Sequence, residues 1–178
     1  GHRNPRVLKA IKAQLEKIIV ASSAFDTEVS ERLRVLLERI LPKNLQYYYM
    51  LNGGSEGVEL ALKIARKVTD RSKFISFING FHGRTMGALA VTWNPKYRRA
   101  FKALLTPSFR FVPFGRLERV EEAISERTAA VIAEPIQGEG GVHIAPEGFL
   151  QGLRNLCDEY GALLILDEVQ TGFGRTGR

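Results

Sequence analysis

The chain has 178 residues, of which 44% are hydrophobic and 25% charged, a composition that is ordinary for one globular domain and excludes a disordered chain. Its 26 basic and 19 acidic residues give a net charge of +7, but the basic residues are scattered along predicted helices, so we expect solvated helix faces, some attraction for anionic ligands and no nucleic-acid partner. The single cysteine, Cys157, excludes an internal disulfide. The sequence has neither the apolar core of a signal peptide nor a run of roughly 20 apolar residues, so we expect a soluble, cytoplasmic protein with no membrane partner.

The spacing of apolar residues predicts helices that alternate with strands along most of the chain. Helices are predicted over residues 5–18, 27–41, 56–68, 86–91, 97–105, 117–125 and 149–160. Strands are predicted over residues 47–51, 73–78, 110–113, 129–133 and in a segment ending at Leu166. Because a parallel crossover requires a connection of helix length, this alternation predicts an α/β fold with a mostly parallel sheet covered by helices on both faces. We expect an N-terminal helical segment, 1–45, before a large domain, 46–178.

Residues 162–170, ALLILDEVQ, are typical of a buried strand that delivers Asp167 and Glu168 at its carboxyl end. Ligands of open α/β sheets bind outside the carboxyl ends of the strands, so an acid in this place is well positioned for chemistry. Taken alone, the same pattern also fits a turn residue or a helix cap. It fits the magnesium-binding strand of a nucleotide hydrolase as well.

Residues 52–56, NGGSE, place glycines and a hydroxyl between a predicted strand and a predicted helix. Free amides and the helix dipole make such a turn an anion site, and glycines allow a phosphate to approach the backbone. The alternative is that Ser55 only caps the helix. The chain contains no G-x-x-x-x-G-K-[ST] phosphate loop and no G-x-G-x-x-G turn after a strand, which weakens the nucleotide-hydrolase interpretation.

Residues 79–85, NGFHGRT, follow the predicted strand 73–78. Phe81 could stack on a flat ring, and the guanidinium of Arg84 could bind a carboxylate through two parallel hydrogen bonds. The alternative is a surface loop in which Phe81 covers the core. His82 has no second ligand at metal spacing, so no metal site is predicted.

Residues 134–141, EPIQGEGG, and residues 171–177, TGFGRTG, are glycine-rich loops that also follow predicted strands. The acids of the first loop either orient a polar ligand or face solvent in an ordinary turn. Because all these motifs would gather at one edge of the sheet, they describe an anion site, an aromatic face, a carboxylate clamp and a deep acid in one pocket. A planar, phosphorylated, nitrogen-containing ring such as pyridoxal phosphate fits that description.

The motifs NGGSEGVELALKIAR, NGFHGRT, AEPIQGEGG and LDEVQTGFGRTG, in this order and spacing, closely resemble those of class III (subgroup II) aminotransferases of fold type I. The resemblance covers nearly the whole chain and implies an incomplete fold type I large domain, pyridoxal 5'-phosphate as cofactor and a homodimer. It also implies that the chain begins inside the enzyme. The Schiff-base lysine and the small C-terminal domain are expected downstream, so we expect the chain alone to be inactive.

The resemblance implies a set of cofactor-binding residues: Gly54, Ser55, Phe81, His82, Glu134, Asp167, Val169 and Gln170. Gly54 and Ser55 would hold the phosphate. Phe81 and Val169 would lie against opposite faces of the ring. Asp167 would pair with the ring nitrogen, which makes it the expected catalytic residue.

The remaining roles that the resemblance implies concern the ring oxygen, the neighbouring acid and the substrate. Gln170 would approach the phenolic oxygen, and Glu134 would support Asp167 or the network beside it. Arg84 would bind the substrate α-carboxylate. Glu139 is the acid that in such enzymes can pair with a substrate-side arginine and so permit two types of substrate.

Within this family, the short connection between residues 110 and 129 and the FHGRT loop are most similar to enzymes that act on acetylornithine or on carrier-linked or acetylated lysine. The implied reaction transfers an amino group from such a small-molecule donor to 2-oxoglutarate, in the biosynthesis of arginine or lysine. Ornithine and 4-aminobutyrate aminotransferases are the alternatives. A non-catalytic α/β ligand-binding module is the rival of another class.

Overall fold

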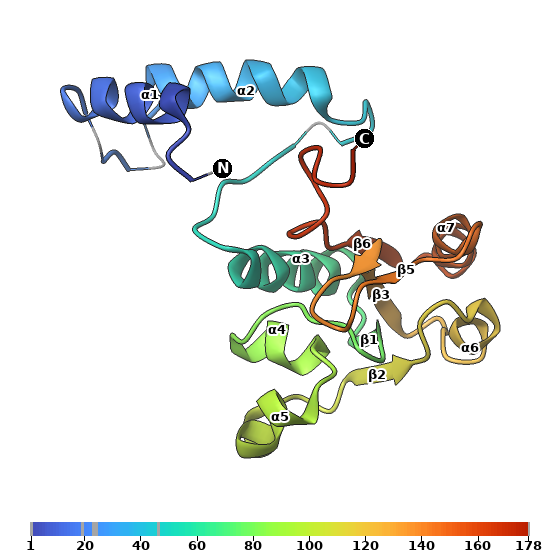
Figure 1. The fold of residues 1–178 in the computed structure, drawn as a ribbon. Helices are drawn as coiled ribbons and strands as arrows, with labels where there is room; N and C mark the ends of the chain where they lie inside the picture. Colours follow the sequence, from blue (N-terminus) through green and yellow to red (C-terminus); the bar gives the residue numbers. More distant parts are fainter. Residues whose placement is uncertain (1, 19, 23–24, 46, 178) are drawn as a thin grey trace. The chain divides into compact units, whose positions relative to one another are not determined.

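A computed structural model of the chain describes residues 2–18, 20–22, 25–45 and 47–177 (Figure 1). Contacts between residues divide the chain into two units, Gly1–Met50 and Leu51–Arg178. This division falls at residue 50, whereas the expected boundary was at residue 45. The second unit holds every strand that the structure describes, and it is the unit that positions the site.

The N-terminal unit consists of two amphipathic helices, α1 (Pro5–Leu15) and α2 (Glu28–Ile40). The side chain of Asn4 caps α1 by accepting a hydrogen bond from Arg6 N at 3.0 Å. Thr27 caps α2 through a reciprocal bond with Ser30, and the helix ends just before Pro42, which cannot continue it. The predicted start of α1 at residue 5 is confirmed, and α2 begins one residue after its predicted start at residue 27.

The second unit is built on a four-stranded sheet with the order β2-β1-β3-β6. Its strands are β1 (Lys73–Phe77), β2 (Phe109–Val112), β3 (Thr128–Ala133) and β6 (Leu163–Leu166). All three pairings are parallel, which confirms the expected mostly parallel sheet. A short antiparallel hairpin of β4 (Ile136–Gln137) and β5 (His143–Ile144), for which no strand was predicted, lies between β3 and the next helix.

Helices cover both faces of this sheet, as expected (Figure 1). The helical elements are α3 (Gly54–Thr69), α4 (Met86–Val91), α5 (Pro95–Arg98), the 3₁₀ helix η1 (Arg99–Leu104), α6 (Leu117–Glu121) and α7 (Phe149–Tyr160). α3 and α4 pack on one face, and α6 and α7 pack on the other. Among the described residues, no helix is long and apolar enough to cross a membrane.

Two apolar layers form the core. On one face, Val58 and Leu62 of α3 pack against Ile132 of β3. On the other face, Leu153 and Cys157 of α7 pack with residues of β1 and β3. Because both faces are covered, every residue of β3 is buried, as is usual for a central strand of a parallel sheet.

The prediction of a strand over residues 47–51 is wrong. The structure assigns no strand there, and these residues pair with no other strand within the described part of the chain. Their side chains are exposed, Tyr47 at 95%. An aromatic run favours a strand only where a partner supplies the hydrogen bonds, and alternation in the sequence cannot show whether that partner exists.

Other predictions need correction in detail. β6 is half-buried instead of buried, because it is the edge strand of the sheet that the structure describes. The helix expected over residues 97–105 is divided between α5 and η1. α3 begins at Gly54, two positions before the expected start at Glu56.

Removing a side chain from the buried layer under α7 should leave a cavity and greatly reduce the stability of the fold. Leu153→Ala should lower the free energy of unfolding by about 2–5 kcal/mol, because Leu153 is fully buried and its removal leaves a void. The matched control is Leu104→Ala on η1, where the side chain is 67% exposed and the cost should stay below about 1 kcal/mol. Urea unfolding of the two variants checks this, and equal losses would contradict the described core.

Candidate functional site

All the residues expected to bind the cofactor line one cavity of about 180 Å³ in the second unit. Its walls come from the first turn of α3, from the loop after β1, and from the residues that follow β3 and β6. The lining residues are Gly54, Ser55, Phe81, His82, Gly83, Glu134, Asp167, Val169 and Gln170. The loops meet because parallel strands deliver their carboxyl ends to the same edge of the sheet.

Asp167 lines the cavity and lies directly after β6. Its backbone N donates to Ala133 O at 2.8 Å, so the pairing of β3 with β6 extends to this residue and fixes its position. The carboxylate Oδ2 lies 2.7 Å from Nδ1 of His82, and the side chains of Asp167 and His82 are only 5% and 1% exposed. Oδ1 accepts a hydrogen bond from Val169 N at 3.1 Å. Both oxygens therefore have partners, as a buried carboxylate requires.

His82 contacts the carboxylate of Asp167, which its sequence context alone did not indicate. An ionised carboxylate only accepts hydrogen bonds, so Nδ1 of His82 donates to Asp167. The His82 backbone N donates to Oγ1 of the buried Thr92 at 2.9 Å, which anchors the loop after β1. Within the described residues, Nε2 of His82 is buried and has no hydrogen-bond partner.

The first turn of α3 forms one wall of the cavity. The alternative that Ser55 only caps this helix is wrong, because the N-cap residue is Gly53 and Ser55 lies inside the first turn. A Cβ at Gly83 would overlap the hydroxyl of Ser55, and a Cβ at Gly54 would lie 2.8 Å from Cγ2 of Val169. Glycine at both positions therefore allows the loops to close around the hydroxyl and the free amides of the helix start.

Glu134 connects the loop after β1 with the loop after β3. Its Oε1 accepts a hydrogen bond from Phe81 N at 2.9 Å, and its Oε2 accepts one from Gly138 N at 3.3 Å. Burial raises the pKa of Glu134, and the two amide donors oppose that rise. Glu134 therefore holds the backbone of Phe81 and lines the same cavity as Asp167.

Arg84 and Glu139 do not line this cavity. Arg84 is exposed, and its backbone N donates to Oγ of Ser55 at 3.3 Å. Glu139 borders a neighbouring hollow of about 220 Å³ that shares Phe81 with the cavity. The hydroxyl of Tyr97 donates to Oε1 of Glu139 at 3.1 Å. Tyr97 was predicted only as a helix residue, and no motif in the sequence indicates this contact.

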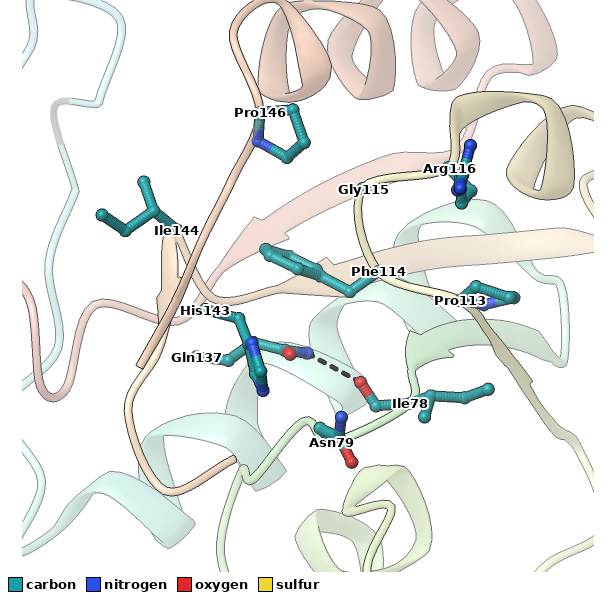
Figure 2. A pocket seen from close by; sticks show the side chains of 10 residues that line it. All are labelled: Ile78, Asn79, Pro113, Phe114, Gly115, Arg116, Gln137, His143, Ile144 and Pro146. Atoms are coloured by element: carbon teal, nitrogen blue, oxygen red, sulfur yellow. Dashed lines mark hydrogen bonds between the residues drawn. The ribbon is translucent and has the colours of Figure 1, made fainter. Parts of the chain in front are cut away.

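A larger cavity, of about 590 Å³, lies beyond the ends of β1 and β2 beside the β4–β5 hairpin (Figure 2). Figure 2 shows Gln137 donating from Nε2 to Ile78 O, at 2.9 Å. The charged side chain on its wall, Arg116, is largely exposed and lies 4.0 Å from Glu118. Size alone does not identify a site, and the buried Asp167–His82 pair makes the smaller cavity the candidate.

Comparison with known proteins identifies relatives of the whole chain. The family described as "Aminotransferase class-III" matches residues 1–178. The acetylornithine aminotransferase of Methanopyrus kandleri is 52% identical over 178 residues, which are 100% of this chain and 46% of that protein. The [LysW]-aminoadipate semialdehyde/glutamate semialdehyde transaminase of Sulfurisphaera tokodaii is 47% identical over the same 100% of this chain and 46% of its own length. The chain therefore spans less than half the length of these relatives.

Solved structures share the fold. The taurine:2-oxoglutarate aminotransferase of Bifidobacterium kashiwanohense, determined in complex with PLP and glutamate, is 31% identical to this chain and superposes on it with a TM-score of 0.90. The superposition covers 100% of this chain and 45% of that chain. Together with the parallel sheet, this similarity establishes the α/β fold of the fold type I large domain.

The Tyr97–Glu139 contact predicts a perturbed titration. The hydrogen bond to Glu139, followed by the charge of that carboxylate, raises the pKa of Tyr97 above its usual value because both favour the neutral phenol. In the full-length protein, E139Q should therefore lower the pKa of Tyr97. Near-ultraviolet difference titrations, each referenced to the same background carrying Y97F, measure this value. A pKa of Tyr97 that is unchanged or higher in E139Q would contradict the contact.

Proposed function

Because the chain belongs to the class III aminotransferase family, we propose that the protein containing it is a pyridoxal-phosphate-dependent transaminase. The proposed reaction transfers an amino group from acetylornithine or a related ω-amino acid derivative to 2-oxoglutarate. The single observation that carries this proposal is the convergence of Ser55, Phe81 and Asp167 on one cavity. Relatives named for acetylornithine and for LysW-linked semialdehydes support a role in the biosynthesis of arginine or lysine.

The residues of the cavity fit pyridoxal phosphate. The hydroxyl of Ser55 and the first amides of α3 suit a phosphate, and the glycines at 54 and 83 keep side chains away from it. Phe81 and Val169 supply apolar surfaces for a flat ring. The buried carboxylate of Asp167 suits a protonated ring nitrogen. When bound, pyridoxal phosphate supplies an electron sink for negative charge that develops next to the substrate nitrogen.

Asp167 is the proposed catalytic residue of this chain. Its carboxylate would hold a proton on the ring nitrogen, and in a buried site this interaction is stronger than it would be in water. His82 and the amide of Val169 hold the carboxylate in place, so little reorganisation is needed when charge develops. Gln170, which lines the cavity, is proposed to approach the phenolic oxygen.

Arg84 and Glu139 are proposed to act on the substrate. Arg84 is exposed and its backbone contacts Ser55, and the planar fork of its guanidinium is proposed to bind an α-carboxylate with two hydrogen bonds. Glu139 is proposed to pair with a substrate-side arginine and so to permit two types of substrate. The lysine that completes the reaction, a homodimeric assembly and a cytoplasmic location are further proposals, supported by the resemblance of the motifs to this family.

The central role of Asp167 gives the first functional test. In the full-length protein, Asp167→Ala should lower kcat by about 100-fold or more, because a preorganised charge in the site is lost. The adjacent acid offers a matched control, since Glu168 is exposed and Glu168→Ala should keep the rate within about twofold. Steady-state transamination and circular dichroism are measured for both variants. A folded Asp167→Ala protein with a near-normal rate would remove Asp167 from the mechanism.

The proposed carboxylate clamp gives the second test. Arg84→Lys keeps the charge but loses the planar fork, so the KM for carboxylate substrates should rise about tenfold. Arg116→Lys, at an exposed arginine on the larger cavity, is the matched control and should leave the KM unchanged. Initial-rate kinetics with both substrates check this expectation. If Arg84→Lys and Arg116→Lys behave alike, Arg84 does not bind the carboxylate.

A further inference from the structure

Two glycines fix the backbone of Glu139 between neighbouring loops. A Cβ at Gly138 would lie 2.5 Å from Oε1 of Gln170, and a Cβ at Gly140 would overlap the backbone carbonyl oxygen of Asn79. The chain can approach the backbone of the loop after β1 only because Gly140 lacks a side chain, whereas a Cβ at Gly138 would displace the flexible amide end of Gln170. The backbone of Glu139 is therefore held beside the hollow of about 220 Å³ that adjoins the cofactor cavity.

Tyr97 fixes the side chain of Glu139. Its hydroxyl donates to Oε1 at 3.1 Å, and its ring meets Phe81 edge to face, with 5.7 Å between ring centroids. Tyr97 thus contacts both the proposed ring-stacking residue and the proposed substrate-side acid. Both contacts border the hollow of about 220 Å³ that also includes Trp93.

The segment that carries Tyr97 is itself anchored. Trp93 N donates to Gly80 O at 2.9 Å, which ties the start of this segment to the loop after β1. The guanidinium of Arg98 lies over the ring of Phe111 on β2, 4.7 Å from its centroid. The position of the Tyr97 hydroxyl is therefore set by the sheet and not by the short helix α5 alone.

We propose that Tyr97 is a specificity-determining positioning residue, which orients Glu139 toward one of the two substrates. This inference rests on the proposed transaminase function and deepens it. A phenol is a neutral donor, so it fixes one carboxylate oxygen without cancelling the charge, and Oε2 is left to receive a cation. Without the hydroxyl, an exposed glutamate samples many rotamers, and ordering it on substrate binding costs entropy.

The consequence differs between the two substrates. The oriented negative charge favours a donor whose reacting carbon carries no carboxylate, such as acetylornithine, and it repels the carboxylate that 2-oxoglutarate carries next to its reacting carbon. Y97F should therefore lower the ratio of kcat/KM for the donor to kcat/KM for 2-oxoglutarate by about fivefold, through loss of one hydrogen bond to a charged group. A tyrosine that only supported Phe81 would change both values of kcat/KM by the same factor, because both substrates react at the cofactor ring on which Phe81 is proposed to stack.

The test uses the full-length holoenzyme, acetylornithine as donor and 2-oxoglutarate as acceptor. The wild type, Y97F, E139Q and the double variant form a mutant cycle, and kcat/KM is measured for each substrate. If Tyr97 acts through Glu139, the ratio shifts in Y97F, and adding Y97F to E139Q produces no further shift. Y160F is the matched control, since Tyr160 packs on the opposite face of the sheet, and its ratio should match the wild type.

Two results would overturn the inference: a ratio in Y97F within about 1.5-fold of the wild type, or effects of Y97F and E139Q on the ratio that multiply in the double variant.

Calorimetric titration with glutarate, an unreactive dicarboxylate, gives a readout besides turnover, and Y97F should bind glutarate more tightly than the wild type. Equal or weaker binding would overturn the inference as well. A wild type without transaminase activity would overturn the proposed function and this inference together, whereas an active wild type with an unshifted Y97F overturns the inference alone.

Discussion

A buried carboxylate is stable in a protein only when other groups compensate its charge, and this constraint shapes the site around Asp167. The residue stands where β6 ends, and its two oxygens are taken by His82 and by the backbone of Val169. The same contacts that make the acid tolerable also fix its direction. A charge that is fixed and shielded from water interacts strongly with a cationic ring placed beside it, which is the condition that pyridoxal chemistry requires.

The rest of the unit holds the loops that meet at this carboxylate. The sheet brings the carboxyl ends of β1, β3 and β6 to one edge, and the buried layers on both faces keep the strands in register. Glu134 links two of the loops through backbone amides, and glycines at 54, 83, 138 and 140 remove the side chains that would keep them apart. The pocket is therefore a product of close backbone approach as much as of its functional side chains.

Much of this arrangement follows from local sequence signals, and the remainder does not. The periodicity of residues 149–160 predicts α7 at its observed bounds, because an amphipathic helix depends on its own residues and one buried face. The segment 47–51 has the residues of a strand but pairs with none among the described residues, and pairing is a long-range property. His82 and Asp167 are separated by 85 positions and Tyr97 and Glu139 by 42. Family motifs identify the first pair as residues of one site but show neither contact, and no motif marks Tyr97.

The protonation of the cofactor ring in the full-length protein tests the central claim most directly. Nitrogen-15 NMR of the holoenzyme, reconstituted with pyridoxal phosphate labelled at the ring nitrogen, distinguishes a protonated pyridinium from a neutral pyridine. If the buried carboxylate of Asp167 pairs with that nitrogen, the resonance will lie at the pyridinium position and stay there across the pH range in which the protein is folded. A neutral pyridine resonance at neutral pH would contradict the account, because the Asp167–His82 pair would then serve some other purpose.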